Sequence, residues 1–567
     1  MNRVRMTLCV ATVVIAVCAA SAAWAVTFHV PGDFDEIADA IAAAANGDTV
    51  LVHPGTYTGA GNRALDFGGK SLALIAEGGP EVTVIDCEGA DRGLYFHTGE
   101  DSTSVVSGFT VRNGYATQGG GVCCEAASPV IDGCVFETNS VTDAGGGIYC
   151  LAAAPTVRTC EFIGNTVTTS GFGHGGGGMQ CNASSPVISG CEFAENSASS
   201  GGGLYCVFGA HPTVTDCVFK ENFTYAYHGA GLFCYDDSSP TVSGCDFILN
   251  SAERNGGGIY CEDSSPEISF SRFLQNEALG MLDGFGGGGV ALLRSAATII
   301  DCEFGANHAV RGGGVNCRDN SHPNILDSVF RANTADAGAG VYCIENSMAQ
   351  LHGDFFEGGV AISGGGLYAD EANPGVTDCI FFSNVSTGTD ETHGGGAVHL
   401  YKAVVSIGST AFIGNAGVRG GAVHVREAAV VSLSEATFAE NSADYGSALY
   451  CRASNLIVGN SIAAFGQGEA VTCVDPLDVV VSCTDVFGNT GGDWTGCIAL
   501  LYGVAGNILA DPLFCGGADI NEAYTLRENS PCASANSPCG QMGKWDVGCP
   551  ATPVEAHSWG EIKAMYR

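Results

Sequence analysis

The sequence predicts an all-β solenoid, a parallel β-helix, and three observations carry this prediction. Glycine-rich blocks such as Gly145-Gly146-Gly147-Ile148-Tyr149-Cys150 return at steps of 25 to 31 residues between residues 119 and 451. A Phe that stands three residues before an Asn returns at the same steps. The blocks show no 3.6-residue period, and Gly, Pro, Asn or Ser bounds each short apolar run, which argues against helical repeats. Propeller blades are longer, and leucine-rich repeats need a Leu ladder that is absent here.

Composition restricts the function. The 567 residues include 83 Gly, yet 46% are hydrophobic, which indicates a folded core rather than a disordered or collagen-like chain. The chain has only 22 Lys and Arg but 60 Asp and Glu, which gives a formal net charge of −38. Nucleic acid is therefore excluded as a partner, because phosphate binding needs clustered cations. The same charge disfavours a bare polyanionic ligand unless a cation bridges it.

The first residues have the pattern of an export signal. Arg3 and Arg5 precede an apolar run over residues 6–20, and Ala23-Trp24-Ala25 supplies a small-x-small cleavage pattern. We expect a signal peptide over residues 1–25 and a secreted or cell-surface protein, including outer-membrane association. The run is shorter than the ~20 residues of a membrane anchor, and no later stretch predicts a transmembrane helix.

A rod of stacked strands needs a cap at each end. Within residues 26–118, Asp33 followed by Glu36 resembles a helix start, an apolar stripe follows, and Asn46-Gly47 ends it. The sequence therefore predicts a capping helix over residues 34–45 and a first strand over residues 49–52. Residues 452–550 lose the period and are expected to form Cys-containing terminal coils and a second cap. The tail, residues 551–567, is either one short amphipathic helix or a sorting tag.

Each repeat between residues 119 and 451 is predicted to form one coil with three short strands, which at this length gives about 18 coils. Equivalent side chains then lie above one another. Phe forms an internal column, and Asn forms a hydrogen-bonded ladder at a bend. The first members of these two columns are Phe136, Phe162, Phe193 and Phe219, and Asn139, Asn165, Asn196 and Asn222.

Cysteines follow the same period, with Cys150 and Cys160 in one repeat. For Cys124 through Cys343 we favour buried thiol ladders, since in-register Cβ atoms stay nearly the strand spacing of ~4.8 Å apart, beyond the usual ~3.8 Å of a disulfide. Disulfides between coils are the alternative, and the spacings do not match structural zinc sites. Disulfides are expected in the terminal coils, among Cys473, Cys483, Cys497, Cys515, Cys532, Cys539 and Cys549.

The blocks also resemble a known family. Gly-Gly-x-aliphatic segments alternating with Phe-x-x-Asn are similar to the repeats of polymorphic outer membrane proteins. Residues 46–57 (NGDTVLVHPGTY) resemble the opening coil of pectin-lyase-like β-helix proteins, and residues 106–114 and 511–514 resemble other segments of them. The resemblance covers about residues 28–550 and implies a single-stranded right-handed parallel β-helix. It says little about function, because enzymes and adhesins share this scaffold.

One acidic cluster is a candidate cation site. Asp236 and Asp237 are followed one coil later by Glu262 and Asp263, and two such pairs stacked about 5 Å apart are tentative Ca²⁺ ligands. The alternative is a solvated turn before Ser-Ser-Pro. No Lys or Arg stands obviously beside these acids as a base. Later coils carry acids at similar places, namely Asp319, Glu345, Asp370 and Glu371.

Three histidines, His174, His228 and His393, lie beside glycine-rich corners. Gly173-His174-Gly175 matches a polygalacturonase motif only superficially, because the other elements of that motif are missing. We expect these histidines to be polar surface side chains.

Regular repetition without a singular catalytic cluster favours a recognition, adhesion or structural module with glycan binding along its flank. The expected partner of this monomeric protein is an extracellular polysaccharide or a cell-surface molecule. The alternative is a polysaccharide lyase or glycoside hydrolase, for which the sequence identifies no catalytic residue and no cofactor other than Ca²⁺.

Overall fold

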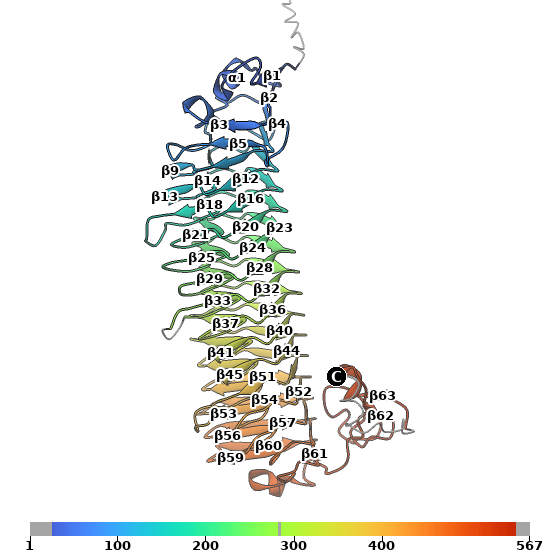
Figure 1. Cartoon of the computed structure of the whole chain (residues 1–567). Coiled ribbons are helices and arrows are strands. Elements are labelled where there is room, and N and C mark those ends of the chain that lie inside the picture. The colour runs from blue at the N-terminus through green and yellow to red at the C-terminus, as the bar shows by residue number, and fades with distance from the viewer. Residues whose placement is uncertain (1–24, 282–284, 552–567) are drawn as a thin grey trace, which may run out of the picture.

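A computed structural model describes residues 25–281 and 285–551, so nearly all of the predicted signal peptide and tail lies outside the described residues. The chain winds into a long rod of stacked coils (Figure 1), and neighbouring strands of the rod pair in parallel and in register. The prediction of an all-β, right-handed parallel β-helix is confirmed. None of the helices in the described ranges has the length and apolar character needed to cross a membrane.

One coil shows the plan of the rod. It contains β14 (Ile148–Leu151), β15 (Thr156–Arg158), β16 (Glu161–Ile163) and β17 (Thr166–Val167). Each strand pairs with its equivalent in the next coil. We call the sheet that contains β15 sheet A and the sheet that contains β16 sheet B. Sheet C contains β14, and sheet D contains β17. The prediction of three strands per coil was incomplete, since the central coils add this fourth strand. It is only two residues long in β17, too short to show an alternating pattern.

Sheet A has 18 strands, from β1 (Thr27–Val30) to β60 (Asp478–Ser482), in agreement with the expected number of coils. Sheet B runs from β3 (Gly55–Tyr57) to β61 (Asp485–Phe487), and sheet D from β9 (Tyr115–Gln118) to β49 (Val385–Ser386). Sheet C, which carries the candidate site, has 15 strands: β6 (Leu94–Phe96), β10 (Val122–Glu125), β14, β18 (Met179–Asn182), β22 (Leu204–Val207), β26 (Leu232–Tyr235), β30 (Ile259–Glu262), β34 (Val290–Leu293), β38 (Val315–Arg318), β42 (Val341–Ile344), β46 (Leu367–Asp370), β50 (Val398–Tyr401), β53 (Val423–Arg426), β56 (Leu449–Arg452) and β59 (Val471–Val474).

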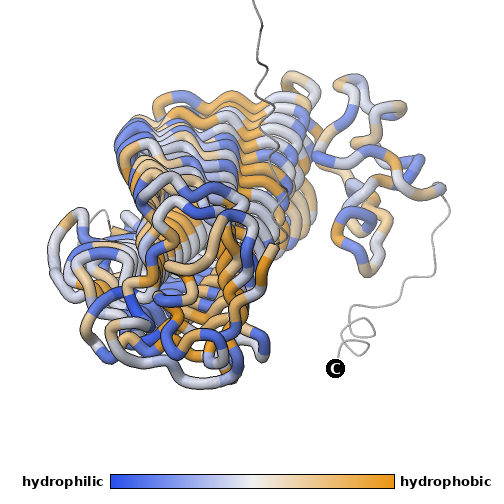
Figure 2. The backbone as a smooth tube through the Cα atoms, turned by 90° about the horizontal axis from the view of Figure 1, so that it is seen from above, coloured by the Kyte–Doolittle hydropathy of each residue, from blue (hydrophilic) through white to orange (hydrophobic). Residues whose placement is uncertain are grey.

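Stacking of like residues fills the interior, and Figure 2 shows equal hydropathy returning from coil to coil as stripes along the rod. The ring of Phe162 lies parallel to those of Phe136 and Phe193, with centroids 5.2 and 4.4 Å away, and Phe219 continues the column. Cys160 and Phe162 point inward, whereas Glu161 between them is exposed. The Asn ladder is fully buried beside the column, at Asn139, Asn165, Asn196 and Asn222.

The cysteines follow both expectations, with free thiols in the repeats and disulfides in the terminal coils. Cys150 stands in register with Cys124 and Cys181, and the cysteines from Cys124 to Cys343 are buried free thiols. Three disulfides join Cys473 to Cys497, Cys483 to Cys539 and Cys515 to Cys549. Cys532 was wrongly included among the disulfide candidates. It is a buried free thiol whose Sγ lies 3.2 Å from Oδ2 of Asp485.

The N-terminal end is closed by α1 (Ile37–Ala43), which buries Ile37, Ala40 and Ile41 against the first coils. The predicted helix was too long at both ends. The Asp33 carboxylate accepts a hydrogen bond from the His29 N–H (2.9 Å) instead of capping the helix, and Glu36 is extended. The predicted strand over residues 49–52 exists as β2 (Thr49–Val52), but β1 precedes it in the sheet.

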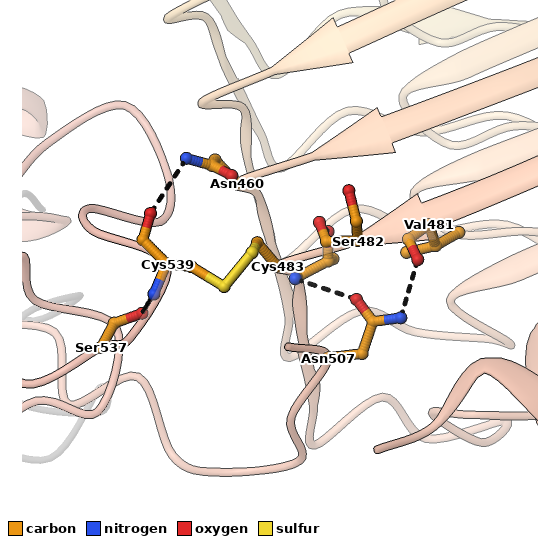
Figure 3. The surroundings of a disulfide bond; sticks show 8 residues. Asn460, Val481, Ser482, Cys483, Asn507, Ser537 and Cys539 are labelled. Atoms are coloured by element: carbon orange, nitrogen blue, oxygen red, sulfur yellow. Dashed lines mark hydrogen bonds between the residues drawn. A yellow bond between two sulfur atoms is a disulfide. The ribbon is translucent and has the colours of Figure 1, made fainter. Parts of the chain in front are cut away.

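At the other end, η2 (Gly496–Leu501) covers the last coils with the buried Ile498. The chain then folds back beside the rod, where α2 (Ile520–Ala523), β62 (Leu526–Arg527) and β63 (Val547–Cys549) form a small module (Figure 1). The Cys483–Cys539 disulfide ties this module to the rod (Figure 3). Lys544 adds hydrogen bonds to Asp378 and to the carbonyl oxygen of Ser409.

Candidate functional site

A row of aromatic rings runs along the outer face of sheet C. In β46, Leu367 and Ala369 point into the core, so the strand's alternation turns Tyr368 and Asp370 outward. The equivalent outward positions of neighbouring strands carry rings too, and successive centroids lie 5.2, 4.9, 4.6 and 4.9 Å apart. In order along the rod, these rings belong to Tyr342, Tyr368, His399, His424 and Tyr450.

The larger of two hollows lies over the start of this row and has a volume of about 690 Å³. We call it the main hollow. Tyr342 and Tyr368 line it together with Arg311, Arg318 and Arg426, which come from three different coils. The carboxylates that line it belong to Asp336, Glu345 and Asp370. Arginine is thus concentrated in one place on a chain of net charge −38.

The three guanidinium groups have different partners. Arg318 Nε lies 3.4 Å from Glu345 Oε2, and Arg311 Nη1 lies 3.8 Å from Asp336 Oδ2. Arg426 donates through Nη1 to the carbonyl oxygen of Thr392 (2.8 Å) and lies 4.6 Å above the Tyr401 ring. Within the described residues, Arg426 forms no ion pair with a carboxylate, so its charge is not neutralised by direct contact.

Burial shifts the titration of two groups in the main hollow. It raises the pKa of Asp370, and the neighbouring Glu371 carboxylate adds to this, while Lys402 and Arg426 act in the opposite direction. Burial also raises the pKa of Tyr368, with the Asp370 charge as a second cause. A carboxyl and a phenol that favour their protonated forms therefore lie side by side on β46.

A second hollow of about 220 Å³ lies further along the same face. Arg419, Tyr445, Tyr450 and Arg452 line it, together with Glu391 and Val474. Arg452 Nη1 lies 2.9 Å from Glu391 Oε2, and the Arg419 guanidinium lies 5.4 Å above the Tyr445 ring. This hollow therefore repeats the combination of arginine and tyrosine found in the main hollow.

The acids proposed as calcium ligands lie outside both hollows. Asp237 and Asp263 occupy equivalent turn positions with φ of 57° and 51°, and the Asp237 N–H donates to the Asp263 carbonyl oxygen (2.9 Å). Asp236 is an extra turn residue, also with positive φ and an exposed side chain. Glu262 ends β30, in register with Tyr235. The stacking of the two coils agrees with the expectation.

Arg294 corrects the statement that no basic residue accompanies these acids. Its guanidinium group contacts Glu262 (2.7 Å), Asp263 (2.8 Å) and Asp319 (3.1 Å), and together these carboxylates raise the pKa of Arg294. Among the described residues, no group of three or more His, Cys, Asp or Glu side chains is placed so that it could hold a metal ion. Calcium binding stays a prediction. In the structure, the Arg294 guanidinium group supplies the positive charge beside Glu262 and Asp263.

Residues 74–273 and 228–405 match the family model described as right-handed β-helix region. The chain belongs to this family. No curated protein matches the chain. Similar solved structures include the family 6 alginate lyase AlyGC (9% identity, 81% of this chain and 97% of that chain covered, TM-score 0.26). A mannuronic acid specific family 6 lyase from human gut microbiota (12%, 79% and 83%, 0.23) and pectate lyase Pel9A (12%, 92% and 96%, 0.18) are also similar.

In this right-handed β-helix, sequence reasoning named part of the main hollow and missed the rest. Glu345 and Asp370 were noted only as acids of repeated turns, and the arginines were not noted. The signal was available, because Arg318, Arg426 and Arg452 each end a strand of sheet C at the same place in the repeat.

The expectation for the histidines was wrong for one of the three, His228. His393 is a polar surface side chain, as expected, that lines the main hollow with Nδ1 2.9 Å from Asp390 Oδ1. His228 is buried, and its ring stacks on Tyr260 with centroids 4.3 Å apart. His174 is half-exposed and lies 2.6 Å from Asp143, in agreement with a polar surface role.

Proposed function

We propose that this β-helix is an exported, monomeric carbohydrate-binding protein whose main hollow recognises a carboxylated polysaccharide outside the cell or at a cell surface. One observation carries the proposal. Arg311, Arg318 and Arg426 converge with the rings of Tyr342 and Tyr368 in the larger of the two hollows.

The chemistry of these side chains matches such a ligand. A tyrosine ring offers an apolar face to the C–H face of a sugar and a hydroxyl to its edge. The planar guanidinium fork of arginine fits a carboxylate with two parallel hydrogen bonds. Because the row of rings follows the rod axis, successive coils offer the same kind of side chain at a spacing of about 4.8 Å, which suits a polymer.

Export is supported by the sequence of the leader and by the disulfides of the terminal coils. Disulfides such as Cys473–Cys497 form and persist in oxidising compartments outside the cytosol. Mass spectrometry of the protein recovered from the expressing cells tests this proposal. A mature chain that begins at Val26 is the expected result, and an intact N-terminus in the cytosol would contradict it.

Calorimetry with oligouronates and with neutral oligosaccharides of equal length tests the ligand class. We expect binding of the uronates only, weakened at high salt. Arg426→Ala removes charge-assisted hydrogen bonds and should weaken binding by about 10- to 100-fold. The matched control is Arg331→Ala on sheet B, whose guanidinium contacts Glu303 and Glu357 outside the groove. Equal binding of neutral and acidic sugars would reject the proposal.

Cleavage of the same polysaccharide is a second candidate, favoured by the position of Asp370 in the main hollow and by its raised pKa. A carboxyl with a raised pKa can donate a proton to a leaving oxygen. Product release should be followed by reducing ends and by absorbance of unsaturated uronates. Turnover that Asp370→Asn abolishes while binding persists would establish an enzyme, and binding without turnover would leave the recognition function alone.

A further inference from the structure

One aromatic floor lies under both hollows. Tyr342 and Tyr368 line the main hollow, Tyr450 lines the second, and the rings of His399 and His424 stand between them in the same row. The four coil steps from Tyr342 to Tyr450 span about 19 Å, longer than a disaccharide. The two hollows thus lie along one row of rings, whose two middle members are buried.

A single loop separates the openings. Residues 387–397 connect β49 to β50 in one of the longer, 31-residue coils. Thr392 and His393 of this loop line the main hollow, whereas the preceding Glu391 lines the second. Gly394, near the end of the loop, lies over the two middle rings, since its carbonyl oxygen is 3.3 Å from Nδ1 of His399 and a Cβ at this glycine would lie 2.5 Å from Nδ1 of His424.

Arginines of the groove hold the loop through oxygen atoms. Arg419 donates to the carbonyl oxygens of Thr389 (2.9 Å) and Asp390 (2.8 Å), and Arg452 pairs with the Glu391 carboxylate (2.9 Å). The Glu391 side chain is 65% exposed, so this pair is weak and exchangeable. A carboxylate on Arg452, in a hollow that Tyr445 and Tyr450 also line, is the contact that a uronate would make there.

Beneath the loop, the floor keeps unused hydrogen-bonding capacity. Both ring nitrogens of His424 are buried and have no hydrogen-bond partner in the described structure. Burial, together with the charges of nearby groups including His399, Arg426 and Arg419, lowers the pKa of His424, so the neutral ring offers one donor and one acceptor.

We propose that the second hollow is a further carboxylate-binding subsite for the same polysaccharide, occupied in the free protein by the chain's own Glu391. A long ligand displaces Glu391 from Arg452, shifts residues 389–393 and reaches from the main hollow into the second, while Gly394 and Gly395 stay hydrogen-bonded to the neighbouring coils. A short ligand fills the main hollow alone and leaves the loop in place. This inference rests on the proposed function and adds to it a requirement for ligand length.

The test compares an uronate disaccharide with the hexasaccharide by calorimetry on the full protein. Glu391→Ala frees Arg452 and should raise the affinity for the hexasaccharide by about two- to fivefold, the range of an exposed ion pair, without the same gain for the disaccharide. Adding Arg452→Ala to Glu391→Ala should remove that gain. Glu357→Ala is the matched control, because Glu357 also pairs with an arginine (Arg331, 3.0 Å) but lies on sheet B. Thermal melts verify that each variant is folded.

The outcomes separate this inference from the proposed function. Equal gains for both oligomers, or a gain that survives Arg452→Ala, overturn the subsite while disaccharide binding that depends on Arg426 keeps the proposed function. If neither oligomer binds to the wild-type protein or to Glu391→Ala, both are overturned.

Discussion

Asn165 Oδ1 lies 3.0 Å from the backbone nitrogen of Asn139 and 3.0 Å from its Nδ2, so one amide oxygen satisfies two donors of the preceding coil. Asn139 Nδ2 also donates to the Val111 carbonyl oxygen. Each Asn of the ladder thus links three successive coils. The ladder is interrupted at Gly359. The backbone there lies so close to the Gly365 carbonyl oxygen that a Cβ would be 2.2 Å from it.

Asn196→Ala is expected to lower the free energy of unfolding by about 1–3 kcal/mol, because it removes the acceptor of the Asn165 N–H and of one Asn165 Nδ2 hydrogen, and a donor to the Phe162 carbonyl oxygen, all of them buried. Urea denaturation followed by circular dichroism measures the change. Asn521→Ala, which removes an exposed amide, is the control and should leave the midpoint unchanged. Equal midpoints for wild type and Asn196→Ala would show that the ladder does not stabilise the rod.

Phe219→Ala should cost about 3–5 kcal/mol, because the ring is fully buried and stacked between Phe193 and Phe247 at 4.8 and 4.7 Å. Phe270 provides the comparison, since its side chain is 65% exposed. Phe270→Ala is expected to change the urea midpoint little. A rod that tolerates both substitutions alike would contradict the stabilising role of the column.

Local periodicity explains how much of the fold the sequence predicts. The Phe-x-x-Asn segment of Phe162 and Asn165 recurs once per coil. In a solenoid this repeat distance determines which residues become neighbours. Sheets A, B and C could therefore be predicted from the sequence. Sheet D was missed because strands such as β17 have two residues. The helix start predicted at Asp33 was wrong because the Asp33 carboxylate accepts the His29 N–H of a competing turn.

The candidate site was only partly predictable because it depends on positions that vary between repeats. Asp370 and Glu345 stand out as acids that follow the glycine blocks at similar offsets. Arg311 stands directly before a glycine block, where the residue changes from coil to coil, and His393 lies in the longer connection between β49 and β50. Their approach to Tyr342 and Tyr368 depends on where the loops fold over sheet C. That placement requires coordinates, since side chains far apart in the sequence meet across the face of the sheet.

Arg294→Ala is expected to make the stability of the protein depend on Ca²⁺ bound at the acidic cluster. Without the guanidinium group, Glu262, Asp263 and Asp319 lose their shared counter-charge and repel one another, which is the situation that Ca²⁺ relieves. The melting temperature of the variant should fall at low ionic strength and rise again with millimolar Ca²⁺. Arg158→Ala, which removes an arginine paired with Asp132 alone, is the control. A Ca²⁺ response of equal size in the wild-type protein would instead support a native calcium site there.

Asp354 should make the stability of the rod depend on pH. It occupies the interior column that Cys160 and Ser328 fill in other coils, accepts a hydrogen bond from the Ser328 N–H (2.8 Å) through Oδ1, and leaves Oδ2 without a partner in the described structure. Burial raises the pKa of this carboxyl to about 8 from an ordinary value of 3.8. The folded chain therefore binds a proton that the unfolded chain releases between these two values.

Stability from this group is fully present below about pH 4 and is lost as the pH rises toward 8, with a slope of at most about 1.4 kcal/mol per pH unit. Asp354→Asn keeps the Oδ1 acceptor and cannot ionise, so its urea midpoint should fall less than that of the wild-type protein between pH 5 and pH 8. Asp35→Asn is the control, because its exposed side chain is in water in both states. Parallel pH profiles for wild type and Asp354→Asn would mean that the buried carboxyl is not protonated in the folded rod.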